Sequence, residues 1–182
     1  FEEDVANSVS DHYLPTGLTS VLPKKPFSYS ISIVDKIDTL VGFFVINEKP
    51  TSSKDPFALR RAAIGLLRII IENKLFFKLR DLISYSIRLY REQGVEIINE
   101  NTEQDVLEFI KERMRNVLKL KNIKTDIIEA SVSSHAGDNF LALYAKTILM
   151  NKYKNKGIGL NAISSYKSCL LYTSPSPRDN RW

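Results

Sequence analysis

Apolar residues recur at intervals of three and four positions along most of this 182-residue sequence. Between residues 28 and 46, for example, Ile33, Ile37 and Leu40 fall on one face of a helix with 3.6 residues per turn. The alternation of apolar and polar residues that is typical of half-buried strands is weak throughout. Only seven glycines and seven prolines interrupt the helical period. The sequence therefore predicts an all-α fold.

Local signals predict where several helices begin. Asp55 can accept hydrogen bonds from the free N–H groups of a first helical turn, and Pro56 suits the first position of a helix. In the following segment Phe76, Leu79, Ile83 and Tyr90 fall near helical spacing, which predicts a further helix. The predicted helices cover residues 2–13, 28–46, 56–72, 75–92, 103–120, 124–133, 138–153 and 160–168, with loops at 14–25 and 47–54.

A boundary between two parts of the chain is predicted between residues 93 and 102. Gly94 is typical of the residue that ends a helix, because glycine adopts the left-handed conformation without steric cost. Asn101 to Gln104 predicts a capping arrangement in front of the next helix. We therefore expect one helical unit before this connection and another after it.

Positive charge is concentrated in particular segments. The formal net charge is +5, but residues 1–48 carry a net charge of −4, whereas residues 54–92 and 111–124 each carry +5. Clustered Lys and Arg side chains attract nucleic acids, because their binding releases condensed counterions. A solvated helix surface would give the same pattern, so charge alone leaves both interpretations open.

Several classes of site and location find no support in the sequence. A single cysteine, Cys169, excludes an internal disulfide framework and a multi-cysteine metal cluster. His12 and His135 leave few ways to build a histidine-based metal site or a catalytic triad, and no glycine-rich phosphate loop of the GxxxxGK[ST] kind is present. No signal peptide is seen, and no apolar run approaches the roughly 18 residues that a membrane span needs. We expect a cytoplasmic protein.

Two strings near the middle of the chain carry a family resemblance. DKIDTLVGFF at residues 35–44 and KPTSSKDPFALRRAAIGLLRI at residues 49–69 resemble the β subunit of the bacterial tetrameric glycyl-tRNA synthetase in order and spacing. DHYLP at residues 11–15 also fits that family, and residues 109–130 resemble the opening helices of its C-terminal anticodon-binding domain. The resemblance covers residues 1–168. Residues 169–182 resemble instead a translated adapter sequence, and we expect a disordered, non-native tail there.

The resemblance implies a fold, a reaction and partners. Residues 1–95 would form the C-terminal part of an HD-domain-like helical bundle, and residues 96–168 would begin a helical anticodon-binding domain. Members of the family act as α2β2 assemblies that join glycine to its tRNA using ATP. The α subunit would hold the catalytic core with ATP and Mg²⁺. The β subunit would bind tRNA(Gly) beside the α subunit and a second β copy, and this fragment alone would be inactive.

The basic residues are the predicted binding groups, and no residue is predicted to be catalytic. Gly65, between Arg61 and Arg68, permits close approach of another backbone, which is either a phosphate chain or a neighbouring helix. In the second interpretation the arginines of this helix pair with carboxylates at residues 35, 38 or 81. Bases would need stacking groups, for which Tyr144, Tyr153 and Tyr166 are candidates, although core packing would also account for each. The predicted tRNA-binding residues are Lys54, Arg60, Arg61, Arg68, Arg113, Arg115, Lys119, Lys121 and Lys124.

An HD-type metal-dependent phosphohydrolase is the alternative function. Asp35 matches the last ligand position of such enzymes, and His12 is the only nearby histidine. A metal site needs several converging ligands. One Asp and one His fall short of that set, so a metal site at Asp35 depends on ligands elsewhere.

Overall fold

A computed structural model describes residues 3–17, 19–51, 54–134 and 137–154. Every regular element in these ranges is an α-helix, which confirms the all-α prediction. The helix predicted at residues 160–168 and the tail at 169–182 lie outside the described residues. The helices are α1 (Glu3–Asp11), α2 (Pro26–Val45), α3 (Leu59–Glu72), α4 (Leu79–Glu92), α5 (Thr102–Leu120), α6 (Thr125–Ser133) and α7 (Phe140–Lys154).

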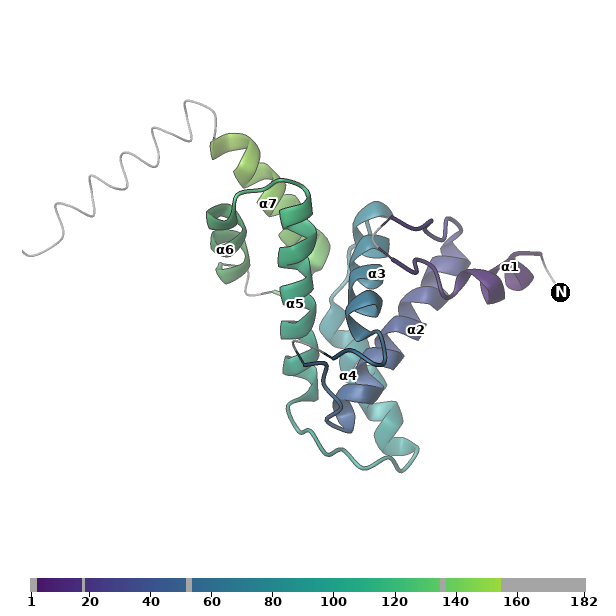
Figure 1. The fold of residues 1–182 in the computed structure, drawn as a ribbon. Helices are drawn as coiled ribbons and strands as arrows, with labels where there is room; N and C mark the ends of the chain where they lie inside the picture. Colours follow the sequence, from purple (N-terminus) through teal and green to yellow (C-terminus); the bar gives the residue numbers. More distant parts are fainter. Residues whose placement is uncertain (1–2, 18, 52–53, 135–136, 155–182) are drawn as a thin grey trace, which may run out of the picture.

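Helices α2 and α5 organise the packing. α2 contacts α1, α3, α4 and α5, while α5 also contacts α3, α4 and α6. α6 and α7 form a helical pair beside the C-terminal half of α5, and α1 projects on the opposite side of the molecule (Figure 1). Leu40 of α2, Leu66 of α3, Met114 of α5 and Leu143 of α7 are fully buried in one apolar cluster. The core therefore continues across the connection at residues 93–102.

Helix α3 begins later than its sequence signals indicate. The prediction placed the first helical residue at Pro56, but the helix begins at Leu59. Ala58 adopts a left-handed conformation with φ of 56°, which separates Pro56 from the helix. The Asp55 carboxylate accepts the N–H groups of Leu59 at 2.8 Å and Arg60 at 3.1 Å. The predicted role of Asp55 as an acceptor is therefore confirmed, whereas the predicted start was wrong by three residues.

Helix α4 also begins later than predicted, at Leu79 instead of residue 75. Phe76 precedes the helix and is 77% exposed, so the prediction that it lies within this helix was wrong. The first turn of α4 is capped from the α6–α7 connection, because Asp138 accepts the N–H of Leu79 through its carbonyl and that of Arg80 through its carboxylate, both at 3.2 Å. A cap from a distant segment leaves no signal in the local sequence.

The end of α4 follows the prediction. Gly94 has φ of +78°, its N–H donates to the Arg91 carbonyl, and the Val95 N–H donates to the Tyr90 carbonyl, both at 3.0 Å. This pair of hydrogen bonds is the Schellman arrangement that satisfies the last carbonyls of a helix. The prediction that Gly94 stops the helix is confirmed.

Helix α4 lies against α2 where α2 lacks a side chain. The Tyr90 hydroxyl donates to the Asp38 carbonyl at 3.3 Å, and a Cβ placed on Gly42 would lie 2.5 Å from that hydroxyl oxygen. Burial, reinforced by the negative charge of Asp38, raises the pKa of Tyr90 to about 12. Gly42 therefore provides the space that the hydroxyl of Tyr90 occupies.

The start of α5 is not capped as predicted. Asn101 occupies the N-cap position but makes no side-chain cap, and Gln104 donates forward to Glu108 at 3.2 Å instead of reaching back. Asn99 supplies acceptors at this helix start instead. Its side-chain oxygen accepts the Asn101 N–H at 3.1 Å, and its carbonyl accepts the Thr102 hydroxyl at 2.6 Å. The predicted capping arrangement at Asn101 to Gln104 was therefore wrong, because Asn99, which lies outside it, supplies the acceptors.

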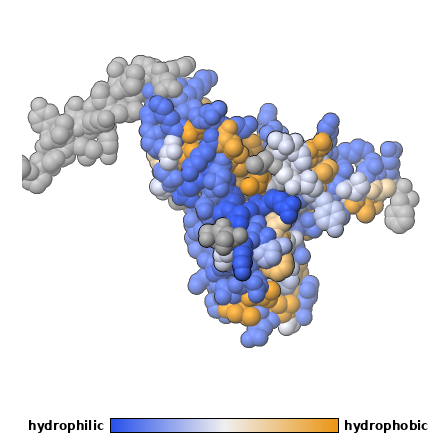
Figure 2. All heavy atoms as spheres, in the orientation of Figure 1, coloured by the Kyte–Doolittle hydropathy of each residue, from blue (hydrophilic) through white to orange (hydrophobic). Residues whose placement is uncertain are grey.

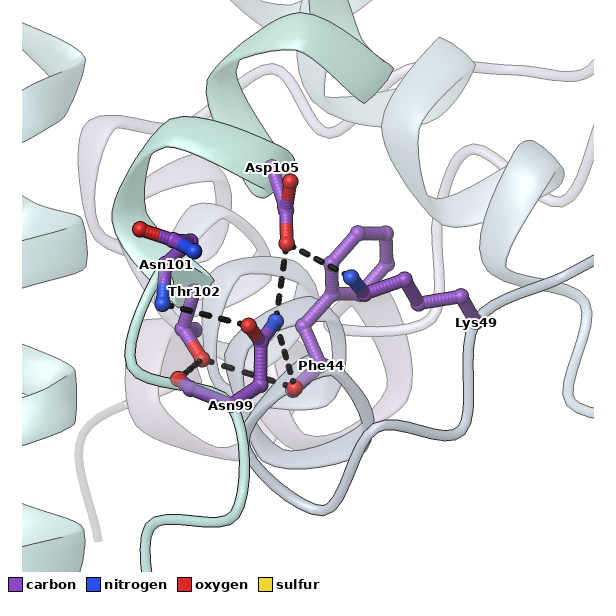
Figure 3. Close-up of polar contacts among 6 residues, drawn as sticks. All are labelled: Phe44, Lys49, Asn99, Asn101, Thr102 and Asp105. Atoms are coloured by element: carbon purple, nitrogen blue, oxygen red, sulfur yellow. Dashed lines mark hydrogen bonds and ion pairs between the residues drawn. The ribbon is translucent and has the colours of Figure 1, made fainter.

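Asn99 and Asp105 also join α5 to the end of α2 (Figure 3). The Asn99 amide donates both to the Phe44 carbonyl at 3.2 Å and to the Asp105 carboxylate at 2.9 Å. Lys49 donates to the same carboxylate at 2.6 Å. The hydrogen bonds from Lys49 and Asn99 hold the pKa of Asp105 below its usual value. We call this set of contacts the α2–α5 joint.

Candidate nucleic-acid interface

Three of the predicted lysines gather where α5 turns into α6. Lys119 lies in the last turn of α5, Lys121 is its C-cap, and Lys124 is the N-cap of α6. All three are exposed, and none forms an ion pair within the described residues. The chain reverses through Asn122, which has φ of 57°, so the three side chains leave one short turn. We call Lys119, Lys121 and Lys124 the cationic turn.

The two predicted arginines of α5 are directed to protein partners instead. Arg113 is buried, with its guanidinium 4.6 Å from the ring centre of Phe109 and Nη2 2.6 Å from Glu112. Arg115 places Nε 3.2 Å from both carboxylate oxygens of Glu129 on α6. A phosphate contact by either arginine would have to displace these groups, so the exposed charge of this region rests on the cationic turn.

Arg68 of α3 is held by the loop that precedes α2. Its guanidinium donates to the backbone carbonyls of Gly17 and of Ser20, the latter at 2.9 Å. Backbone carbonyls orient the side chain without cancelling its charge. Arg68 is therefore fixed in place but keeps a net positive charge.

Gly65 lies against protein, as the helix-packing interpretation predicts. A Cβ at Gly65 would lie 2.9 Å from Lys36 Cε and 3.2 Å from the Pro15 carbonyl oxygen. Lys36 is itself buried and donates to the His12 carbonyl at 3.2 Å. Burial lowers the pKa of Lys36, and the charge of Asp35 opposes that shift. The close approach that Gly65 allows is thus used by α2 and the loop before it.

The remaining predicted cations lie at the start of α3. Arg60 donates to the Thr51 carbonyl, while Lys54 and Arg61 are exposed. The pairing of these arginines with Asp35, Asp38 or Asp81 is not formed among the described residues. Their contact with RNA or with another subunit stays a prediction.

A groove opens beside the cationic turn, between α3, α5 and α7. It has a volume of about 420 Å³, and Tyr144 of α7, one of the predicted stacking groups, lines it. Tyr153 is half-exposed elsewhere on α7, and Tyr166 lies outside the described residues. The groove could not be predicted from the sequence, because its lining comes from four separated segments. The lining residues are Thr19, Arg68, Ile71, Glu72, Val117, Leu120, Lys121 and Tyr144.

Asp35, the weak metal candidate, belongs to no cluster of metal ligands within the part of the chain that the structure describes. No three His, Cys, Asp or Glu side chains come together there as a metal-binding group. His12 turns its Nδ1 toward the Val9 carbonyl at 2.6 Å. Nothing in these contacts favours the phosphohydrolase interpretation.

Comparison with known proteins decides the family. The model of the family described as glycyl-tRNA synthetase beta subunit matches residues 1–133, which extend from before α1 to the end of α6. The chain belongs to this family. The region that carries the family signature of glycyl-tRNA synthetase β subunits therefore includes the whole cationic turn.

Curated relatives named glycine–tRNA ligase beta subunit agree with this membership. The protein of Colwellia psychrerythraea is 47% identical over 128 residues, which are 70% of this chain and 18% of the relative. Those of Rhodospirillum centenum and Rickettsia canadensis are each 35% identical, over 90% and 98% of this chain and 22% and 28% of the relatives. The chain thus spans between about a fifth and just over a quarter of the length of these β subunits. Among its described residues, no helix combines the length and the apolar character needed to cross a membrane.

Proposed function

We propose that this chain is the part of a glycine–tRNA ligase β subunit that holds tRNA(Gly) through its cationic turn while the α subunit performs the ATP-dependent glycylation. Family membership supports the reaction. The observation that supports the binding role is the set of three exposed lysines at one helix turn, none of which forms an ion pair among the described residues. Phosphates are the groups that such lysines bind, and contacts to phosphates give affinity and register without reading sequence.

In this proposal the chemistry belongs to the assembly and not to this segment. ATP and Mg²⁺ bind to the α subunit, and the β subunit pairs with the α subunit and with a second β copy in an α2β2 tetramer in the cytoplasm. The described residues contribute binding surface, and none is assigned a catalytic role. The segment alone is therefore expected to bind tRNA without charging it.

Charge reversal at the cationic turn tests the binding role. Lys119→Glu combined with Lys121→Glu changes the charge by −4, and the matched control is Arg88→Glu with Arg91→Glu on α4. These arginines are also exposed, and Arg91 belongs to the last turn of α4, near the end of α5 opposite the cationic turn (Figure 1). The affinity of the 182-residue chain for tRNA(Gly) is measured at salt concentrations from about 50 to about 300 mM. In this range affinity that depends on phosphate contacts falls steeply with salt.

The lysine variant is expected to bind at least about tenfold more weakly, with the logarithmic salt slope reduced by about 2, whereas the control keeps most of its affinity. Equal losses in the two variants would show a non-specific charge effect and would contradict the proposal, as would equal binding by the lysine variant and the wild type.

Aminoacylation tests the division of labour. The complete β subunit that carries this chain is mixed with the α subunit, and charging of tRNA(Gly) is compared with formation of glycyl-adenylate from glycine and ATP. The lysine variant is expected to raise the KM for tRNA while leaving the tRNA-independent adenylate step unchanged. A variant that slows adenylate formation to the same extent as charging would place the cationic turn in a different role.

A further inference from the structure

We propose that the groove between α3, α5 and α7 holds one unpaired nucleobase of the RNA that the cationic turn binds. This inference rests on the proposed function and specifies which part of the RNA enters the protein. Lys121 belongs both to the cationic turn and to the groove lining, so the groove opens directly beside the cationic turn.

The walls of the groove are suited to a flat apolar object. Ile71, Val117 and Leu120 contribute aliphatic surface, and Tyr144 contributes an aromatic ring. Leu120 is 63% exposed although it lies next to the buried Val117, so the apolar surface continues outward from the core. Figure 2 shows apolar residues interrupting a mostly hydrophilic surface near the C-terminal end of α5. The volume of about 420 Å³ falls within the range of sites that enclose small ligands.

The charges around the groove favour a nucleotide over an uncharged ligand. Arg68 and Lys121 both line it, against the single carboxylate of Glu72. Arg68 is held in place by backbone carbonyls and not by an acidic group, so its charge is available and its position needs no further ordering. A phosphate follows every base in RNA. A base in the groove would therefore place its own phosphates near Arg68 and the cationic turn.

The size and character of the groove also distinguish unpaired from paired RNA. Bases within a duplex are covered by their stacked neighbours, and a groove of this size cannot admit a helix. Unpaired bases can be splayed out and stacked on aromatic side chains, which is the usual mode of RNA readout by proteins. An apolar protein side chain could fill the same space, but the surrounding exposed lysines favour a polyanion.

Variants of Tyr144 separate stacking from packing. Tyr144→Phe keeps the ring and Tyr144→Leu keeps apolar volume without it, while Tyr85→Leu on the exposed face of α4 is the control. The probes are a single-stranded RNA of about ten nucleotides and a blunt duplex that contains the same strand. Tyr144→Leu is expected to weaken single-strand binding by about 5- to 150-fold. Tyr144→Phe and Tyr85→Leu are expected to stay within about twofold of wild type, and duplex binding is expected to be unchanged in all three variants.

Leu120→Ser provides a second test of the groove that does not depend on the folding of the Tyr144 variants. Leu120 is largely exposed, so its replacement removes groove wall with little loss of core. It is expected to weaken single-strand binding several-fold and to leave duplex binding unchanged. Urea midpoints of all variants are compared first, so that a loss of binding is not a loss of folded protein.

The outcomes separate this inference from the proposed function. If charge reversal at the cationic turn weakens RNA binding but Tyr144→Leu and Leu120→Ser leave single-strand binding unchanged, the nucleobase site is refuted and the tRNA-binding role stands. If charge reversal also has no effect, the proposed function itself fails. If Tyr144→Leu weakens binding of the α subunit and not of RNA, the groove is a protein contact and the inference is overturned.

Discussion

Replacing Gly42 with alanine tests how α2 and α4 fit together. The new Cβ would lie 2.5 Å from the Tyr90 hydroxyl oxygen and 3.1 Å from Cζ, so the tyrosine must move. Overpacking of this kind costs about 1–3 kcal/mol. The change from Gly to Ala within a helix returns about 1 kcal/mol of helix propensity. We therefore expect Gly42→Ala to lower the free energy of unfolding by up to about 2 kcal/mol.

Removing the hydroxyl should relieve most of this penalty. Tyr90→Phe loses a hydrogen bond to the Asp38 carbonyl that is 3.3 Å long, which is expected to cost about 1 kcal/mol or less. In that background Gly42→Ala should be close to neutral, which gives a coupling energy of about 1–2 kcal/mol in a double-mutant cycle. Urea unfolding of the four proteins measures it. Gly17→Ala is the control, because nothing lies within 4 Å of a Cβ there.

A Gly42→Ala penalty that is the same whether position 90 holds tyrosine or phenylalanine would refute this reasoning. It would mean that the cost arises in α2 itself, and that the space beside Gly42 is not reserved for the hydroxyl.

Three further predictions concern helix ends and pH. Asp138→Ala is expected to lower the free energy of unfolding by about 1–2 kcal/mol and to speed amide hydrogen exchange in the first turn of α4, while Asp138→Asn, which keeps an acceptor, should cost less. Lys74→Gly is expected to raise the free energy of unfolding by about 1 kcal/mol, measured by urea midpoint, because Lys74 adopts φ of 53° and glycine carries no steric penalty there. The pKa of Tyr90 is raised from 10.0 to about 12, so the folded state favours the protonated phenol and its contribution to stability is complete below pH 10 and lost as the pH rises toward 12. Urea midpoints of wild type and Tyr90→Phe across that interval should converge as the pH rises.

The helices were predictable because their signal is local. The apolar period of residues 28–46 is carried by neighbouring turns of one helix, and α2 spans Pro26–Val45. The left-handed end at Gly94 needs only the residue itself. The start of α4 could not be predicted in this way. It is set by Asp138, which caps Arg80 from 58 residues away in sequence, and no helical period reveals such a cap. Phe76 was therefore wrongly included in the helix.

The candidate site shows the same difference between local signals, which the sequence reveals, and contacts with distant segments, which it does not. The cationic turn could be predicted, since three lysines within six residues at a helix end must lie close together. The ion pair of Arg115 could not be predicted, because its partner Glu129 belongs to another helix. Burial of Arg113 beside Phe109 is likewise a consequence of tertiary packing. Charge clustering in a sequence therefore identifies a region, and packing then selects which of its cations face outward.

The α2–α5 joint has a consequence for anyone who recombines β subunits from different bacteria. The connection at residues 93–102 resembles a linker and invites a crossover there. Yet Asn99 within the connection and Asp105 beyond it form hydrogen bonds with Phe44, Lys49 and each other. A hybrid gene spliced in this connection would take the two halves of one hydrogen-bonded set from different parents. Splice sites before α2 or beyond α7 would inherit the set intact and keep the shared core with it.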